Sequence, residues 1–135
     1  MAPKIRTIDA KMTVADAAKA MARWKVGSLI LVEGPKPVGI VTEGDISRSV
    51  AKGVDPSRAS LRSMKKRLIT VKPETKLEDA ARLMASEGIK KLPVVDGDKL
   101  QGIITESDIV AASFDLVTSL KEMVITRYRP PGFEP

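Results

Sequence analysis

Two copies of one eight-residue motif carry the side chains that could bind a small polar ligand. Gly-Ile-Val-Thr-Glu-Gly-Asp-Ile spans residues 39–46, and Gly-Ile-Ile-Thr-Glu-Ser-Asp-Ile spans residues 102–109, 63 residues later. Each copy predicts an apolar strand that leads into a helix, with a threonine at the helix start and an aspartate three residues on. The threonines are Thr42 and Thr105, and the aspartates are Asp45 and Asp108.

The chemistry of these two side chains suits a ligand that carries neighbouring hydroxyl groups and a negative charge. A vicinal diol offers two adjacent hydroxyl donors, and one ionised carboxylate can accept hydrogen bonds from both. The threonine lies where unpaired backbone N–H groups and the positive end of the helix dipole favour an anion. Neither group makes or breaks covalent bonds in such an arrangement, so the motif favours binding over catalysis.

A purely structural interpretation of the motif is also open. Threonine followed three residues later by an acid is a capping box, in which the two side chains satisfy backbone donors at the helix start. One copy alone favours that interpretation, whereas two copies inside a longer motif favour ligand binding, and the two roles are compatible. Glu43 and Glu106 stand beside the aspartates and would allow a paired-carboxylate enzyme. We expect both to face the solvent at the helix starts.

The composition excludes most classes of enzyme. Among its 135 residues the chain has no Cys and no His, which excludes disulfides, thiolate chemistry, zinc sites of the usual kind and catalysis by histidine. The formal net charge of +6 favours anionic partners such as nucleotides, nucleic acid or acidic protein surfaces. Asparagine is absent and 30% of the residues are charged, which resembles the composition of heat-adapted proteins.

The sequence predicts a folded cytoplasmic protein. An apolar share of 43% is enough to bury a core. No apolar run approaches the roughly 20 residues that would span a bilayer. The first residues, Met-Ala-Pro-Lys-Ile-Arg, lack the apolar segment of a signal peptide.

The elements around the first motif follow a regular order. Residues 5–8 predict a short extended segment, and Thr13 with Asp16 predicts a capped helix. Residues 28–41 predict a hairpin of two aliphatic strands around a Gly-Pro turn. The apolar face of the helix is expected to consist of Val14, Ala18, Met21 and Ala22.

The second half of the chain repeats that order without a gap. Residues 68–71 are the extended segment, Thr75 with Glu78 predicts the capping box, Gly88 predicts the end of the helix, and residues 91–104 predict the hairpin. The apolar face is expected to consist of Leu77, Ala81, Met84 and Ala85. A register kept over so many positions indicates a duplicated unit.

Three segments lie outside the repeat. Asp55 and Pro56 predict a short helix between the copies. Residues 114–125 predict a last helix, and the prolines in residues 128–135 predict an extended arm because they cannot continue it. Each half alone would bury too little surface, so we expect the halves to pair through their apolar sheet faces.

This order of elements, with its Gly-Ile-hydrophobic-Thr-x-x-Asp-Ile motif, resembles the CBS domain, which is named after cystathionine beta-synthase. Two in tandem resemble a Bateman module, and the resemblance covers nearly the whole chain. It implies an α+β fold of two βαββα lobes that pack through their small sheets with pseudo-twofold symmetry, plus the C-terminal helix and extended arm. The implied division is 1–62 for the first domain, 63–127 for the second and 128–135 for the arm.

The resemblance implies a regulatory, non-catalytic module that binds AMP or, alternatively, ADP, ATP or S-adenosylmethionine, and signals to a partner as a homodimer. It implies no required cofactor and no metal. In such modules the aspartate holds the ribose hydroxyls, the threonine bonds to ribose or phosphate, and adenine lies between the extended segment and the hairpin. The implied site residues of the first copy are Thr7, Ile8, Ser28, Leu29, Thr42 and Asp45. Those of the second copy are Thr70, Val71, Lys91, Leu92, Pro93, Thr105 and Asp108.

The two copies differ beside the motif. The second has Lys91 and Pro93 where the first has Ser28 and Ile30. The second site is therefore the more basic, and we expect Asp108 and its threonine to be occupied first. The cations that could reach a phosphate are Lys4, Arg6, Arg48, Lys65, Lys66, Arg67, Lys90 and Lys91. Such clusters are more often solvated surface.

Two other functions remain open at this point. A basic nucleic-acid-binding module could use the lysine clusters, and its affinity would fall steeply as salt rises. A protein adaptor could use the same fold with empty clefts and a binding surface on the last helix and arm. Met21 and Met84 are expected in the core, and Trp24 in packing or at a subunit contact.

Overall fold

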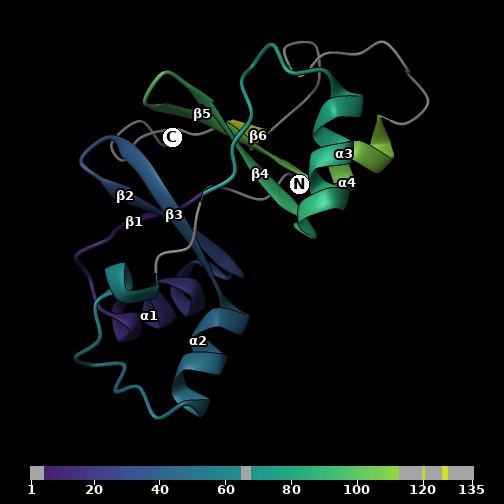
Figure 1. The fold of residues 1–135 in the computed structure, drawn as a ribbon. Helices are drawn as coiled ribbons and strands as arrows, with labels where there is room; N and C mark the ends of the chain where they lie inside the picture. The colour runs from purple at the N-terminus through teal and green to yellow at the C-terminus, as the bar shows by residue number, and fades with distance from the viewer. Residues whose placement is uncertain (1–4, 65–67, 113–119, 121–125, 128–135) are drawn as a thin grey trace. The chain divides into compact units, whose positions relative to one another are not determined.

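The computed structural model in Figure 1 describes residues 5–64, 68–112, 120 and 126–127. The chain forms two compact units, Arg6–Leu68 and a second unit that contains the chain from Ile69 onwards. Each unit has its own three-stranded sheet, helices and core. The expected α+β class is confirmed. Apart from Leu120, the helix predicted at 114–125 and the arm at 128–135 lie outside the described residues.

The first unit is a three-stranded sheet with two α-helices, in the order strand, helix, hairpin, helix. Its elements are β1 (Thr7–Asp9), α1 (Val14–Trp24), β2 (Ser28–Glu33), β3 (Lys36–Thr42), α2 (Glu43–Ala51) and the 3₁₀ helix η1 (Leu61–Met64). Strand β2 is central, with β1 parallel on one side and β3 antiparallel on the other. The predicted hairpin and the helix that follows it are confirmed.

The capping box predicted for the first helix is confirmed. The Asp16 N–H donates to Thr13 Oγ1 at 3.1 Å, and the Thr13 N–H donates to Asp16 Oδ2 at 3.0 Å. Two orphan donors at the start of α1 are thus satisfied by two side chains. The buried face is Val14, Ala17 and Met21. The expected Ala22 is exposed, because the core-facing stripe follows the i, i+3, i+7 positions from Val14.

The second unit repeats the arrangement with two changes in its sheet. Its elements are α3 (Leu77–Glu87), β4 (Lys91–Asp96), β5 (Lys99–Thr105), α4 (Glu106–Ala111) and β6 (Thr126–Arg127). Where the first unit has β1, the second has a single parallel bridge from Val71 to Val94. Strand β6 pairs antiparallel with β5 at Gly102 and Ile103. The sequence did not predict this third strand.

Two predicted caps are wrong. Helix α3 begins after Lys76, which makes no side-chain cap hydrogen bond, and Thr75 Oγ1 instead accepts the Lys72 N–H at 3.1 Å. The 63-residue offset explains this, since it pairs Lys76 with Thr13. The helix predicted at Asp55 is a single turn, in which Asp55 Oδ1 accepts the Ser57 N–H at 3.0 Å and its hydroxyl at 2.7 Å.

Each unit has a separate aliphatic core. In the first unit it is built from Ala10, Val14, Ala17, Met21, Leu29, Leu31, Val41 and Leu61. In the second it is built from Val71, Leu77, Ala80, Met84, Leu92, Val94, Ile104 and Leu120. The prediction that Met21 and Met84 are core residues is confirmed. Helix α3 buries Ala80, whereas the expected Ala85 is exposed. Gly88 ends α3 at φ +64°, as predicted.

The uncapped start of α3 yields a stability prediction. Lys76→Thr supplies a hydroxyl at the position that Thr13 occupies in the first unit, with Asp79 in place of Asp16. We expect it to raise the free energy of unfolding by about 0.5 to 1 kcal/mol, and Thr13→Ala to lower it by about 1 kcal/mol. Urea unfolding measures both. Lys76→Ala removes the same lysine without supplying a hydroxyl, and equal stability of the two Lys76 variants would contradict the explanation.

The first capping box also predicts a pH dependence. The hydrogen bond from the Thr13 N–H, followed by the bond with its side chain, holds the pKa of Asp16 below its ordinary value of 3.8. The folded pKa is depressed, so this contribution is present above the unfolded pKa and is lost as the pH falls through the folded one. Asp16→Asn should therefore show a flatter loss of stability with falling pH in this acid range. Thermal unfolding against pH checks this, with Asp98→Asn in the exposed β4–β5 turn as control.

Candidate functional site

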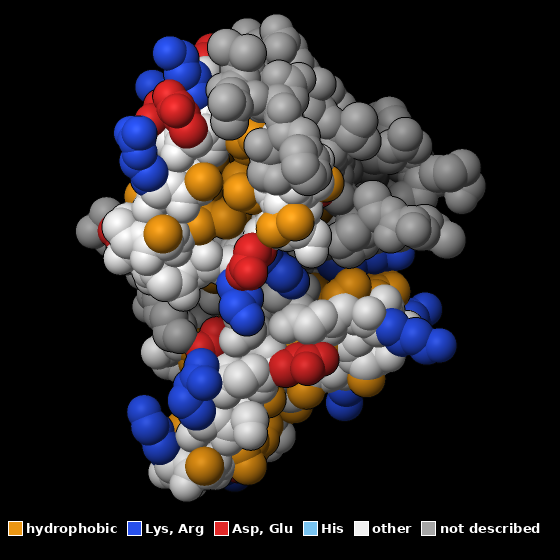
Figure 2. Space-filling model, turned by 90° about the vertical axis from the view of Figure 1, so that its right-hand side faces the viewer, with side chains coloured by type: hydrophobic (Ala, Val, Ile, Leu, Met, Phe, Trp, Pro, Cys, Tyr) orange, Lys and Arg blue, Asp and Glu red, His pale blue; other side chains and the backbone are white. Residues whose placement is uncertain are grey.

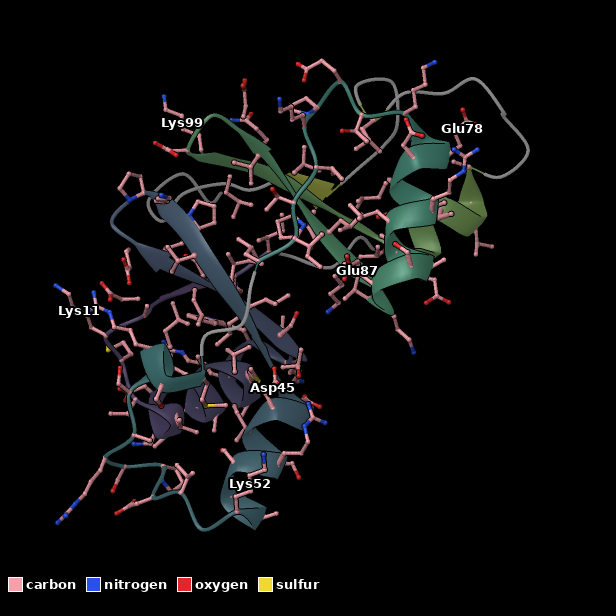
Figure 3. All side chains as sticks on the ribbon, in the orientation of Figure 1. Lys11, Asp45, Lys52, Glu78, Glu87 and Lys99 are labelled. Atoms are coloured by element: carbon pink, nitrogen blue, oxygen red, sulfur yellow. The ribbon has the colours of Figure 1, made fainter. Side chains whose placement is uncertain are left out.

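The end of the first hairpin brings three of the predicted site residues together. The pairing of β2 with β3 sets Ser28 opposite Thr42, and Thr42 is the residue from which α2 begins. The Glu43 N–H donates to the Gly27 carbonyl at 3.0 Å, which ties the helix start to the beginning of β2. Figure 3 labels Asp45 in this first turn of α2. Thr42, Asp45 and Ser28 thus share one end of the sheet.

Both carboxylate oxygens of Asp45 are engaged. Oδ2 accepts the Thr42 N–H at 3.0 Å, and the Asp45 N–H donates to Thr42 Oγ1 at 3.2 Å, so the capping-box interpretation of the first motif is confirmed. Oδ1 accepts a hydrogen bond from Arg48 Nη2 at 2.8 Å. Asp45 is only 8% exposed, whereas the Arg48 side chain is 64% exposed. A nearly buried carboxylate is therefore paired with a cation that reaches it from the solvent side.

The second junction repeats the cap without the arginine. Asp108 Oδ2 accepts the Thr105 N–H at 2.8 Å and the Thr105 hydroxyl at 3.0 Å. The Asp108 N–H donates back to Thr105 Oγ1 at 3.3 Å. The register sets Lys91 opposite Thr105. Among the described residues Thr105 alone hydrogen-bonds the Asp108 carboxylate, and all its bonds go to Oδ2, so Oδ1 keeps its full capacity to accept.

The extended-segment residues lie beside the hairpins, as their backbone pairing shows. Thr7 and Ile8 on β1 pair with Ile30 and Leu31 of β2. In the second unit the Val71 N–H donates to the Pro93 carbonyl at 3.0 Å, and Val71 accepts the Val95 N–H at 2.8 Å. Thr70, one residue earlier, is exposed.

Several predicted apolar ligand residues belong to the unit cores. Leu29 is 1% exposed, Leu92 0% and Val71 6%, and Pro93 is fully buried. Within their own units these side chains offer almost no free surface for adenine. The polar members Thr42, Asp45 and Ser28, with their second-unit counterparts Thr105, Asp108 and Lys91, are the ones that each hairpin end gathers. Their assignment to a ligand stays a prediction.

The cations singled out in the sequence are in different settings. Arg48 contacts Asp45, and the Arg6 guanidinium lies 4.8 Å from the centroid of the Trp24 ring. Lys91 is half-buried and Lys90 exposed. Lys4, Lys65, Lys66 and Arg67 lie outside the described residues. The sequence reasoning missed the partner of Arg48, although the i, i+3 spacing from Asp45 was a signal for it.

A hollow of about 360 Å³ lies in the second unit beside α3 and α4. Its lining is mostly apolar, with Lys90 and Glu106 as the charged members, and the other lining residues are Ala81, Met84, Ala85, Gly88, Ile89 and Ile109. Figure 2 views the face that carries these helices, where hydrophobic side chains gather. None of the predicted nucleotide-binding residues lines this hollow. Glu43 and Glu106 are exposed, as expected.

Neither a metal-binding cluster nor a membrane-spanning helix occurs in the part of the chain that the structure describes. Within the described ranges no three His, Cys, Asp or Glu side chains are grouped so that they could hold a metal ion. Of the helices in the described part of the chain, none has both the length and the apolar character needed to cross a membrane.

The chain matches the family model of the CBS domain over residues 1–52 and 59–115. Together with the repeated fold and the two capped strand-to-helix junctions, this match defines a class of regulatory module, the tandem CBS-domain pair. The chain belongs to the CBS-domain family.

Similar proteins come from bacteria and archaea. The CBS domain-containing protein YhcV of Bacillus subtilis is 34% identical over 110 residues, which cover 81% of this chain and 79% of YhcV. An uncharacterized protein of Methanopyrus kandleri is 35% identical over 114 residues, and the match spans 82% of this chain but only 58% of the relative. The solved structure of the CBS domain protein PAE2072 from Pyrobaculum aerophilum, complexed with AMP, has a TM-score of 0.70 and 25% identity, covering 79% of this chain and 83% of that one.

The geometry of the second junction predicts the effect of removing its hydroxyl. Thr105→Ala deletes the acceptor of the Asp108 N–H and one of the two donors to Oδ2. We expect a loss of about 1 kcal/mol in the free energy of unfolding. Ser107→Ala removes an exposed hydroxyl two residues away, and its effect should stay within about 0.5 kcal/mol. Urea unfolding of both variants decides, and equal stabilities would show that Thr105 does not cap α4.

Proposed function

We propose that this chain is a regulatory, non-catalytic module that binds an adenosine compound at its strand-to-helix junctions and passes the bound state to a partner protein. AMP is the preferred ligand, with ADP, ATP and S-adenosylmethionine as related candidates. The observation that carries the proposal is the carboxylate of Asp108, which Thr105 fixes through Oδ2 while Oδ1 can still accept. The AMP complex of the Pyrobaculum aerophilum relative supports the choice of ligand.

The bonding capacity of this carboxylate matches a ribose. Each carboxylate oxygen has two lone pairs, and Oδ1 of Asp108 can accept from both hydroxyls of a 2′,3′-diol. Hydrogen bonds to an ionised acceptor are stronger than neutral ones, which makes one aspartate sufficient to hold the sugar. The half-buried Lys91, opposite Thr105, supplies a cation beside the junction for a phosphate.

The second junction is proposed to fill first. Lys91 lies opposite Thr105 there, and among the described residues Asp108 has no arginine partner of the kind that engages Asp45. Binding at the first junction has to compete with that ion pair. The same proposal includes the domain division 1–62 and 63–127 with an arm at 128–135, a homodimer, and no cofactor beyond the nucleotide.

Calorimetry with AMP tests the proposal directly. Asp108→Asn keeps the shape of the side chain and an oxygen for the Thr105 N–H, but it removes the charge and the second acceptor. We expect the AMP affinity at this site to fall about tenfold or more, because hydrogen bonds to charged groups contribute about 1.5 to 3 kcal/mol. Asp98→Asn makes the same charge change in the exposed β4–β5 turn and should leave the affinity unchanged.

A second ligand sharpens the same experiment. Deoxyadenosine monophosphate lacks the 2′-hydroxyl but keeps the 3′-hydroxyl, so it should bind the native chain more weakly than AMP and lose less affinity than AMP does in Asp108→Asn. Equal AMP affinity of the native and Asp108→Asn chains would refute the assignment. An oligonucleotide that binds more tightly than AMP, with affinity falling steeply as salt rises, would establish the nucleic-acid function instead. If the chain binds none of these ligands, the outcome supports the alternative function of a protein adaptor.

A further inference from the structure

The two junctions differ at two positions that act together. In the first unit Arg48 Nη2 contacts Asp45 Oδ1 at 2.8 Å. Gly44 lies beside this arginine, and a Cβ there would lie 3.1 Å from Arg48 Nη1 and 3.5 Å from Nη2, so that the guanidinium would have to shift slightly. The 63-residue offset places Ser107 and Ala111 at these two positions in the second unit. One copy therefore has an arginine beside a glycine, and the other has an alanine and a serine at the same positions.

We propose that Arg48 is a specificity-determining residue that makes the first junction selective for 5′-phosphorylated ribonucleosides over neutral ones. This inference rests on the proposed function. Arg48 occupies Asp45 Oδ1, the counterpart of the Asp108 oxygen that is assigned to the ribose. A neutral nucleoside has to displace the guanidinium from that oxygen and gives it nothing in exchange. A nucleotide offers its phosphate as a new partner.

The energetics of the exchange follow from burial. Asp45 is 8% exposed, so its carboxylate depends on protein donors, and a ligand that displaces Arg48 from Oδ1 must supply a hydrogen bond in place of the one from the arginine. The guanidinium is always charged, and its side chain is 64% exposed, which lets it move without any change in the backbone. Transfer from carboxylate to phosphate replaces one charge-assisted hydrogen bond by another. A phosphate therefore compensates for breaking the Arg48–Asp45 ion pair, whereas an unphosphorylated ribose does not.

Position 111 leads to the opposite expectation for the second junction. Ala111 cannot reach Asp108, and the Asp108 carboxylate is bonded by Thr105 through Oδ2 alone among the described residues. The ribose can therefore bind without displacing a cation. Adenosine should lose less affinity relative to AMP at this junction than at the first.

The test isolates each junction and exchanges the two residues. In an Asp108→Asn background, which weakens the second junction, Arg48→Ala should strengthen adenosine binding at the first junction about three- to tenfold, in keeping with an exposed arginine on a buried carboxylate. The same change should weaken AMP binding. The ratio of AMP to adenosine affinity, measured by calorimetry, should therefore fall.

The reverse exchange, which introduces the arginine into the second junction, controls for the possibility that the Arg48 variant is simply unfolded. In an Asp45→Asn background, Ser107→Gly with Ala111→Arg should weaken adenosine binding and raise the AMP-to-adenosine ratio, and Ser107→Gly alone should not. Circular dichroism confirms that each chain is folded. The proposed role of Arg48 would be wrong, and the proposed function left standing, in either of two cases. In the first, AMP binds but the ratio of AMP to adenosine affinity is unchanged in both exchanges. In the second, the first junction binds no ligand with either residue at position 48. If the native chain binds no adenosine compound at either junction, the proposed function itself is wrong.

Discussion

The backbone N–H that each hairpin presents at its junction with the following helix is the constraint on which both halves of this protein depend. At these part-buried positions the donor needs a partner, and Asp45 Oδ2 or Asp108 Oδ2 accepts its hydrogen bond at 3.0 or 2.8 Å. The next N–H along the chain returns to the residue before the first hairpin strand, at Gly27 or Lys90. The aspartate is thereby fixed in orientation, and the proposed ligand contact uses the acceptor capacity that remains once the cap is made.

What occupies that remaining capacity separates the two junctions. The caps are nearly superimposable in their bonding, with the same threonine, the same aspartate and the same two backbone donors. One difference lies on the next turn of the helix, where one copy has Arg48 and the other Ala111. Another lies on the facing strand, where Lys91 stands in place of Ser28. The local charge at each junction is consequently set by side chains that contribute nothing to the cap.

Local patterns made much of the fold predictable, and the failures have physical causes. Hairpins and the boxes at Thr13, Thr42 and Thr105 depend on residues within a few positions of each other, so the sequence contains them. Thr75 failed because a hydroxyl one residue too early can close a turn onto Lys72 as readily as cap a helix. Strand β6 has two residues and is defined only by its distant partners on β5. The i, i+3 spacing could have predicted the contact between Arg48 and Asp45, but its energetic importance depends on the burial of Asp45, which the sequence does not show.

The division of labour between the two carboxylate oxygens explains how a duplicated unit can diverge without losing its fold. Oδ2 carries the structural role, and a change that affects only the surroundings of Oδ1 leaves the cap intact. Arg48 is mostly exposed, so its loss or gain costs little stability by comparison with a core change. In the proposed function, ligand preference at each junction can therefore vary through positions such as 44 and 48, or 107 and 111, while Thr-x-x-Asp stays fixed by the need to begin the helix.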